Sequence, residues 1–191
     1  MNERSEAMMT TINTLGLAAL LTLAGIPAFG ADLATTTFRD HVDGEGNISL
    51  PADARASWVH LGSWVVNDAE APGAGFHDVY TQPEAAQAYR DSGEFADGTV
   101  LIKEIRGIES AEKTTGPALW AGEPQLWFVM VKDAQGRFDG PHWGEGWGWA
   151  LFKADNPDVN VSESFESTCM GCHVPAQQTD WVYVEGYPTL Q

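Results

Sequence analysis

One stretch sets the fold class: Ala96-Asp97-Gly98-Thr99-Val100-Leu101-Ile102-Lys103-Glu104-Ile105. Asp-Gly is a turn signal, and the β-branched, apolar run after it is typical of a strand, so we predict a turn that leads into a strand. Successive side chains of a strand alternate between two faces, so Leu101, Lys103 and Ile105 should share one face. A lysine among apolar neighbours is unusual, because a buried ammonium is costly unless it is paired or neutralised.

Further strand signals lie on both sides of this stretch. Residues 58–66 are aromatic and β-branched, and they predict a strand with Trp58, His60 and Trp64 on one face. Strands are also expected over residues 125–132, over the Trp- and Gly-rich residues 143–152, and over residues 181–184, with a turn at 133–136. These strands predict a mostly antiparallel sheet.

Two short helices complete the predicted architecture. Thr81-Gln82-Pro83-Glu84 has a capping-box pattern with proline in the first turn, residues 85–90 favour a helix, and Gly93 can end it. Residues 162–172 predict a second short helix. The predicted fold class is therefore mostly β (α+β), an antiparallel sheet with a few short helices.

The N-terminal segment has the layout of a secretory signal peptide. An apolar run from Leu15 to Gly25 is followed by the small-residue cluster Ala28-Phe29-Gly30-Ala31. The run is shorter than the roughly 20 residues that cross a bilayer, which favours cleavage near Gly30 or Ala31 over retention as an anchor. We predict a cleaved signal peptide over residues 1–30, one domain over residues 31–191, and a periplasmic protein.

The chain is strongly acidic, with a formal net charge of −17 at pH 7. Such a surface repels nucleic acid and anionic lipid, which excludes both as partners. We expect small neutral molecules, or proteins with a basic face such as periplasmic electron-transfer proteins, to be its partners.

The chain has two cysteines, in the motif Cys169-Met170-Gly171-Cys172-His173. Two cysteines in an exported chain would ordinarily suggest a disulfide, but Cys-x-x-Cys-His is the signature of c-type haem attachment. A structural zinc site needs about four ligands, and no further cysteine can supply them; a redox pair would need a βαβ context. We therefore predict one covalently attached haem c, held by Cys169 and Cys172, with His173 as the proximal iron ligand.

The position of this motif bears on the second axial ligand of the iron. Only 18 residues follow His173, and none is a methionine, which leaves Met130 as the plausible sulfur ligand. His41, His60, His77 and His142 are more readily explained as ordinary surface or hydrogen-bonded histidines. We therefore predict an open sixth position, at which small ligands bind or react.

Apart from a C-terminal haem motif, the chain has little in common with the four-helix cytochromes c-prime, because its middle lacks long heptad-like runs. It resembles instead the cytochrome P-460 and cytochrome c-prime-beta family, a β-rich group with the motif near the C-terminus. The stretches that carry the resemblance are residues 58–62, 77–80, 96–105, 146–149 and 169–173. They extend through most of the predicted mature chain.

The resemblance implies a homodimer and one of two activities. Proteins of the P-460 type oxidise hydroxylamine, with nitric oxide chemistry at the iron, and their haem macrocycle is cross-linked to a lysine. Proteins of the c-prime-beta type lack that cross-link and bind nitric oxide behind a nonpolar, aromatic distal wall. Lys103 is the best match for the cross-linking lysine, and Lys113 is the alternative.

Three further expectations concern the surroundings of the haem. Hydroxylamine oxidation releases protons, and we expect a carboxylate near the distal face, Glu145 or Asp139, to accept them. Trp143, Trp147 and Trp149 are interpreted first as packing residues. A simple electron carrier, with Met130 as sixth ligand, is the third functional hypothesis beside the oxidoreductase and the gas-binding protein.

Overall fold

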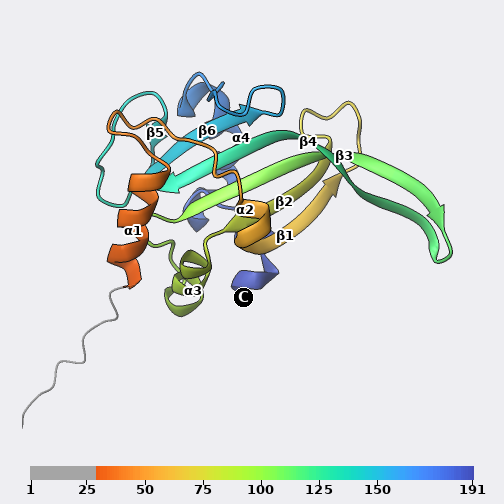
Figure 1. Cartoon of the computed structure of the whole chain (residues 1–191), viewed down its shortest axis with the longest axis horizontal. Helices are drawn as coiled ribbons and strands as arrows, with labels where there is room; N and C mark the ends of the chain where they lie inside the picture. The colour runs from red at the N-terminus through yellow and green to blue at the C-terminus, as the bar shows by residue number, and fades with distance from the viewer. Residues whose placement is uncertain (1–28) are drawn as a thin grey trace, which may run out of the picture.

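The computed structural model describes residues 29–191. Its centre is a six-stranded sheet in which every paired strand is antiparallel (Figure 1). In order across the sheet the strands are β1 (Val59–Val66), β2 (Gly75–Thr81), β3 (Val100–Lys113), β4 (Gly116–Lys132), β6 (Trp147–Lys153) and β5 (Trp143–Gly144). The mostly β prediction is confirmed.

Helices come before, within and after the strands in the sequence. On the N-terminal side and within the sheet region they are α1 (Phe29–Asp40), α2 (Ala54–Ser57) and α3 (Pro83–Ser92). The C-terminal segment holds the π-helix η1 (Phe165–Met170), α4 (Gly171–His173), and the 3₁₀ helices η2 (Val174–Thr179), η3 (Val184–Gly186) and η4 (Pro188–Leu190). No described helix is long and apolar enough to cross a membrane. Residues 1–28 of the predicted signal peptide lie outside the described residues.

Helix α3 ends at the predicted glycine, but its N-terminus lacks the predicted capping box. Gly93 follows its last residue with a φ of 75°, a left-handed conformation that glycine adopts without strain. The predicted capping box does not form, because the helix begins at Pro83 and Thr81 precedes the N-cap position; the Thr81 hydroxyl donates to the carbonyl of Val100. Gln82 occupies the N-cap position, and its side chain makes no capping bond.

The predicted strand over residues 181–184 is wrong. Asp180 and Trp181 both have positive φ, 56° and 66°, which extended backbone does not allow. The chain turns there and continues into η3.

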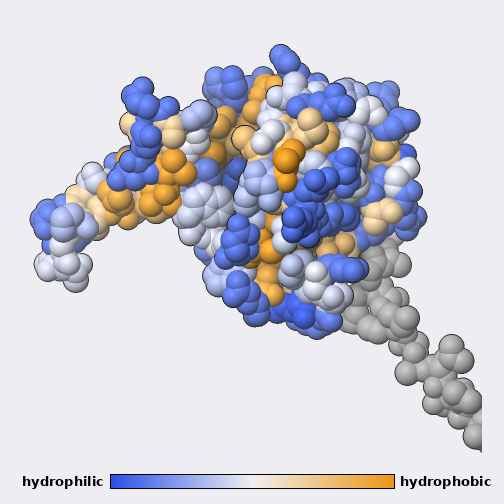
Figure 2. All heavy atoms as spheres, turned by 180° about the vertical axis from the view of Figure 1, so that it is seen from behind, coloured by the Kyte–Doolittle hydropathy of each residue, from blue (hydrophilic) through white to orange (hydrophobic). Residues whose placement is uncertain are grey.

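Strands β3 and β4 are much longer than predicted. Beyond the body of the sheet they continue as a two-stranded hairpin that projects from the molecule (Figure 1). Residues 106–124 lack the regular apolar alternation of a strand with one face in the core, so their local pattern did not predict a strand. Leu119 and Trp120 on this arm are 45% and 39% exposed, and the space-filling view shows apolar atoms gathered along it (Figure 2).

Both faces of the sheet are covered, and each carries its own hydrophobic core. The first face holds Leu101, Met130 and Trp149, on which the C-terminal segment packs. The second face holds Ile102, Val129 and Ala150, packed with residues of the N-terminal segment. Helix α1 passes so close to the turn before β3 that a Cβ at Gly98 would overlap the backbone of Ala34. Gly98 also has a φ of 81°, so two independent constraints favour glycine there.

A β-bulge at Leu61 corrects the predicted face of β1. The register with β2 shifts between His60 and Gly62, so the side chains beyond the bulge change sides relative to a regular strand. The ring of His60 lies 5.3 Å from that of Tyr80, on the second face. Trp64 instead stacks on His77, on the first face.

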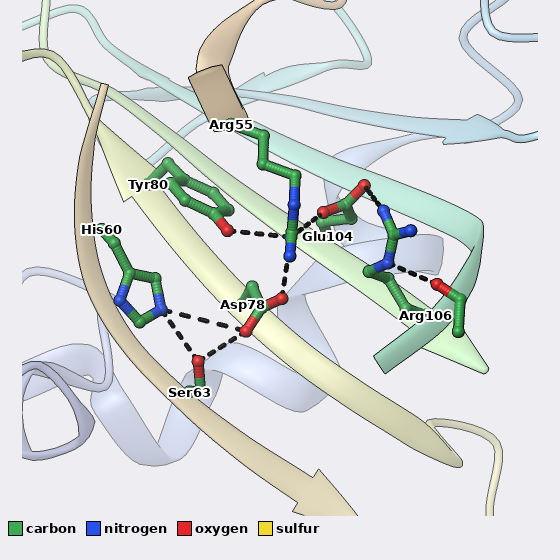
Figure 3. A network of polar contacts seen from close by, with 8 residues as sticks. Arg55, His60, Ser63, Asp78, Tyr80, Glu104 and Arg106 are labelled. Atoms are coloured by element: carbon green, nitrogen blue, oxygen red, sulfur yellow. Dashed lines mark hydrogen bonds and ion pairs between the residues drawn. The ribbon is translucent and has the colours of Figure 1, made fainter. Parts of the chain in front are cut away.

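A polar network lies on the second face (Figure 3). One nitrogen of Arg55, from α2, donates to Asp78 at 2.9 Å, to Glu104 at 2.6 Å and to Tyr80 at 2.9 Å. Arg106 donates to the other oxygen of Glu104. Burial alone would raise the pKa of Asp78, but hydrogen bonds from Ser63 and Arg55 outweigh it and hold the pKa below its usual value.

The network on the second face holds Asp78 on β2 and Glu104 on β3, and the residue next to each of them points to the first face. Asp78 and Glu104 are cross-strand partners on β2 and β3, and both carboxylates are buried. Their chain neighbours His77 and Lys103 alternate to the opposite face. The polar network on the second face therefore sets the positions of His77 and Lys103 on the first face.

Candidate functional site

A cavity with a volume of about 260 Å³ lies between the first face of the sheet and the C-terminal segment. Its walls are mainly apolar and aromatic side chains of β2, β3, β4 and β6. Cys169, Cys172 and His173 line its C-terminal side, and Lys103 lines its sheet side. The structure therefore brings together the motif and the lysine that the sequence singled out, 66 positions before the first cysteine.

The two cysteines are held at the rim by an unusual helix. Cys169 is near the end of the π-helix η1, a rare geometry that is frequent at functional sites. The Ser164 hydroxyl caps this helix by accepting from the Ser167 N–H. The thiols are not joined to each other, and Cys169 is buried whereas Cys172 is exposed. Burial raises the pKa of the Cys169 thiol to about 11, which is unlike the thiolate of a redox-active pair.

His173 has the orientation of a metal ligand. Its Nδ1 lies 2.7 Å from the carbonyl oxygen of Trp181, which can only accept, so Nδ1 carries the hydrogen. Nε2 is then the nitrogen with the lone pair. The edge of the ring meets the ring of Trp149, with centroids 4.8 Å apart. Burial lowers the pKa of His173, which favours the neutral imidazole that binds metals.

Lys103 shares the first face with Leu101 and Ile105, as the strand alternation predicts, and all three line the cavity. Its Nζ lies 4.4 Å from the centre of the Phe128 ring. No hydrogen bond or ion pair to the Lys103 amine occurs within residues 29–191. Burial lowers its pKa, which increases the fraction of neutral, nucleophilic amine.

His77 also belongs to the cavity, although its sequence context suggested only an ordinary histidine. Its Nε2 donates to the carbonyl of Gly73 at 2.7 Å, and its ring stacks on Trp64. Its Nδ1 is buried without a hydrogen-bond partner. The alternation His77, Val79 on β2 was the available signal, because both side chains line the cavity with Lys103.

The other sequence candidates lie elsewhere, with one exception. Glu145 is exposed at the turn between β5 and β6, where it adopts a φ of 57°, and it lines a separate surface hollow together with Asp139. Neither carboxylate lines the cavity of Cys169, His173 and Lys103. Lys113 lies at the tip of the β3–β4 arm, over Trp120. Met130 does line the cavity, where it packs in the core.

Comparison with known families explains this combination of features. A family model described as Cytochrome P460 matches residues 51–184, a region that contains the cavity, the motif and Lys103. The chain belongs to the cytochrome P460 family. No curated protein matches the chain. The chain is therefore a haem protein, and members of its family are typically secreted.

The residues of this cytochrome P460 fit a haem in the cavity. Nε2 of His173 could ligate an iron, the two thiols line the same side of the cavity, and the remaining walls are mainly apolar and aromatic. The Lys103 amine, which makes no hydrogen bond or ion pair with residues 29–191, lines the sheet side of the same cavity. No group of three or more His, Cys, Asp or Glu side chains that could hold a metal ion by themselves occurs in the described part of the chain.

Proposed function

We propose that this protein is a periplasmic, mono-haem c-type cytochrome that oxidises hydroxylamine, with nitric oxide chemistry at the iron. Cys169 and Cys172 would hold the haem covalently, and His173 would ligate the iron through Nε2. When bound, the haem supplies an iron centre that accepts electrons and takes small nitrogen oxides as ligands. A small neutral substrate suits this chain, because the negative surface does not repel it.

One observation carries the proposal: the half-buried Lys103 side chain lines the haem cavity, and its amine makes no hydrogen bond or ion pair with residues 29–191. Its one described contact is with the Phe128 ring, and a desolvated ammonium without a carboxylate partner is costly, so a role at the cofactor explains the residue better than stability does. A neutral amine at this position would be suited to form the macrocycle cross-link of the P-460 type. The ring of Phe128 limits where the amine can reach.

The protein residues would also manage water and protons. The aromatic wall of Trp64, Phe128 and Trp149 excludes bulk water from the iron. Protons released by the substrate need an acceptor, and His77 is a cavity-lining side chain with a vacant acceptor nitrogen. Burial lowers the pKa of His77, so its ring is neutral and able to accept at neutral pH.

The experiment compares the ferrous absorption spectrum and hydroxylamine turnover of the wild type with those of Lys103→Met. Lys113→Met, on the distant arm, is the matched control. We expect the wild type and the control to show a red-shifted, broadened Soret band and turnover, and Lys103→Met to show an ordinary c-type spectrum without turnover. An ordinary spectrum in all three proteins contradicts the cross-link.

One observation favours a second function, the binding of nitric oxide without turnover. No aspartate or glutamate of residues 29–191 lines the cavity, and its sheet-side wall is aromatic and aliphatic, as expected behind a c-prime-beta type haem. This function predicts an ordinary high-spin spectrum and nitric oxide binding with no hydroxylamine oxidation. A low-spin spectrum with a weak sulfur-to-iron band would indicate instead an electron carrier with Met130 as sixth ligand.

We also propose that the chain forms a homodimer through its β3–β4 arm and passes electrons to a basic periplasmic protein. A two-stranded ribbon on its own is only marginally stable in water, and this arm exposes Leu119 and Trp120. A second copy of the arm would cover both. Sedimentation of the wild type should give a dimer and that of Leu119→Lys a monomer; a monomeric wild type contradicts the dimer.

A further inference from the structure

We propose that Asp180 and Lys132 are positioning residues that set the electron donation of the proximal histidine. They contact neither the iron nor a substrate. They hold the backbone carbonyl of Trp181, which accepts the hydrogen bond from His173. The inference rests on ligation of the haem by His173, and it holds whichever substrate the haem takes.

Lys132 and Asp180 form an ion pair between the sheet and the C-terminal segment. The Nζ of Lys132, the last residue of β4, lies 2.8 and 2.7 Å from the two oxygens of Asp180. The Lys132 side chain is only 12% exposed and lies over the ring of Trp147, with Nζ 4.9 Å from the ring centre. The Trp147 indole also donates to Asp180 at 3.2 Å. The carboxylate is thus held by three hydrogen bonds from two neighbouring strands.

The backbone that follows the anchored carboxylate is strained. Asp180 and Trp181 are two consecutive residues with left-handed φ values, 56° and 66°. Aspartate tolerates this conformation, but a bulky residue such as tryptophan is strained in it. Such strain persists only where the surroundings over-determine it, and it occurs preferentially at functional sites. Here the anchors are the Asp180 ion pair and the bond from the Trp181 N–H to the Ala176 carbonyl, 2.9 Å long.

The turn at Asp180 and Trp181 acts on His173, the proposed metal ligand. The strained turn aims the Trp181 carbonyl at Nδ1 of His173, at 2.7 Å. A strong acceptor at Nδ1 makes the imidazole a better donor through Nε2, and partners of this kind typically change metal affinity or activity by roughly 10- to 100-fold. The Trp181 side chain is itself packed in the core against Phe165, so the carbonyl cannot swing away freely. Loss of the ion pair would let the turn relax and lengthen this hydrogen bond.

The experiment measures the reduction potential and the iron–histidine stretching frequency of the ferrous holoprotein. Asp180→Asn removes the charge while keeping a side chain that tolerates positive φ, and Lys132→Met removes the other partner. Asp97→Asn is the control, because it breaks an ion pair with Arg137 that lies outside the cavity lining. We expect a more positive reduction potential and a lower iron–histidine stretching frequency in Asp180→Asn and in Lys132→Met, and wild-type values in the control.

Asp180→Gly separates charge from backbone strain, because glycine accepts the left-handed φ without an ion pair. It should behave like Asp180→Asn. Wild-type potential and frequency in Asp180→Asn and Lys132→Met, even with reduced thermal stability, would overturn the inference and leave the ion pair with a purely structural role. Failure of the haem ligation itself would look different, because the wild type would then show no iron–histidine band.

Discussion

Replacing Arg55 by methionine tests the polar network beneath the haem cavity. The guanidinium makes one hydrogen bond each to the buried carboxylates of Asp78 and Glu104, and methionine preserves only the apolar stem. A hydrogen bond to a charged group contributes about 1.5–3 kcal/mol, so two would give about 3–6 kcal/mol. The Arg55 side chain is 49% exposed, and each carboxylate keeps another partner, Ser63 or Arg106. Solvent screening therefore reduces the expected loss to about 2 kcal/mol.

Urea denaturation of the holoprotein measures this loss. With an m-value of about 2 kcal/mol/M, the midpoint should fall by about 1 M at pH 7. The pKa of Asp78 is lower in the folded than in the unfolded state, so its stabilisation is present above the unfolded pKa of about 3.9 and is lost as the pH falls through the folded pKa. The difference between wild type and variant should therefore shrink below about pH 4. A midpoint change below about 0.2 M, or an equal change at pH 3 and pH 7, would refute the reasoning.

Three further predictions follow from the packing and the motif. Gly98→Ala should lower the free energy of unfolding by about 2 kcal/mol or more, because it combines a left-handed φ with a clash against Ala34. The control Gly136→Ala, also at positive φ but with open space around it, should lower it by about 1 kcal/mol. Equal shifts in the melting temperatures of the two variants would contradict this. Trp149→Leu should loosen His173 and lower the iron–histidine stretching frequency in resonance Raman spectra. His77→Ala should slow hydroxylamine oxidation most at neutral pH without changing the ferrous spectrum; an unchanged rate would exclude His77 as the proton acceptor.

The sequence predicted the features that depend on local pattern. The alternation around Lys103, the glycine that ends α3 and the Cys-x-x-Cys-His motif each follow from a few neighbouring residues, and the structure bears out the strand face and the helix end. The cavity adds what sequence spacing could not give, the meeting of Lys103 with Cys169 across the fold.

The failures arise where tertiary contacts override local pattern. The bulge at Leu61 moves Trp64 to the face opposite His60, and the available signal was Gly62, because an isolated glycine inside a strand pattern indicates a bulge. The β-branched and aromatic residues 181–184 suggested a strand, but the ion pair of Asp180 holds the preceding backbone in a left-handed turn. Glu145, predicted from its place beside the tryptophan-rich strand, lies at the exposed β5–β6 turn, and its role at the haem stays a prediction.

The central claim is that Cys169 and Cys172 hold a haem covalently beside His173. The most direct measurement is the intact mass of the protein, expressed with export and c-type cytochrome maturation, after denaturation in acidified acetone. The account predicts a single species with the mass of the processed chain plus one haem, and no haem bound after denaturation in a Cys169→Ala, Cys172→Ala double variant. A wild-type chain that appears at its bare polypeptide mass, with the haem released into the solvent, would contradict it.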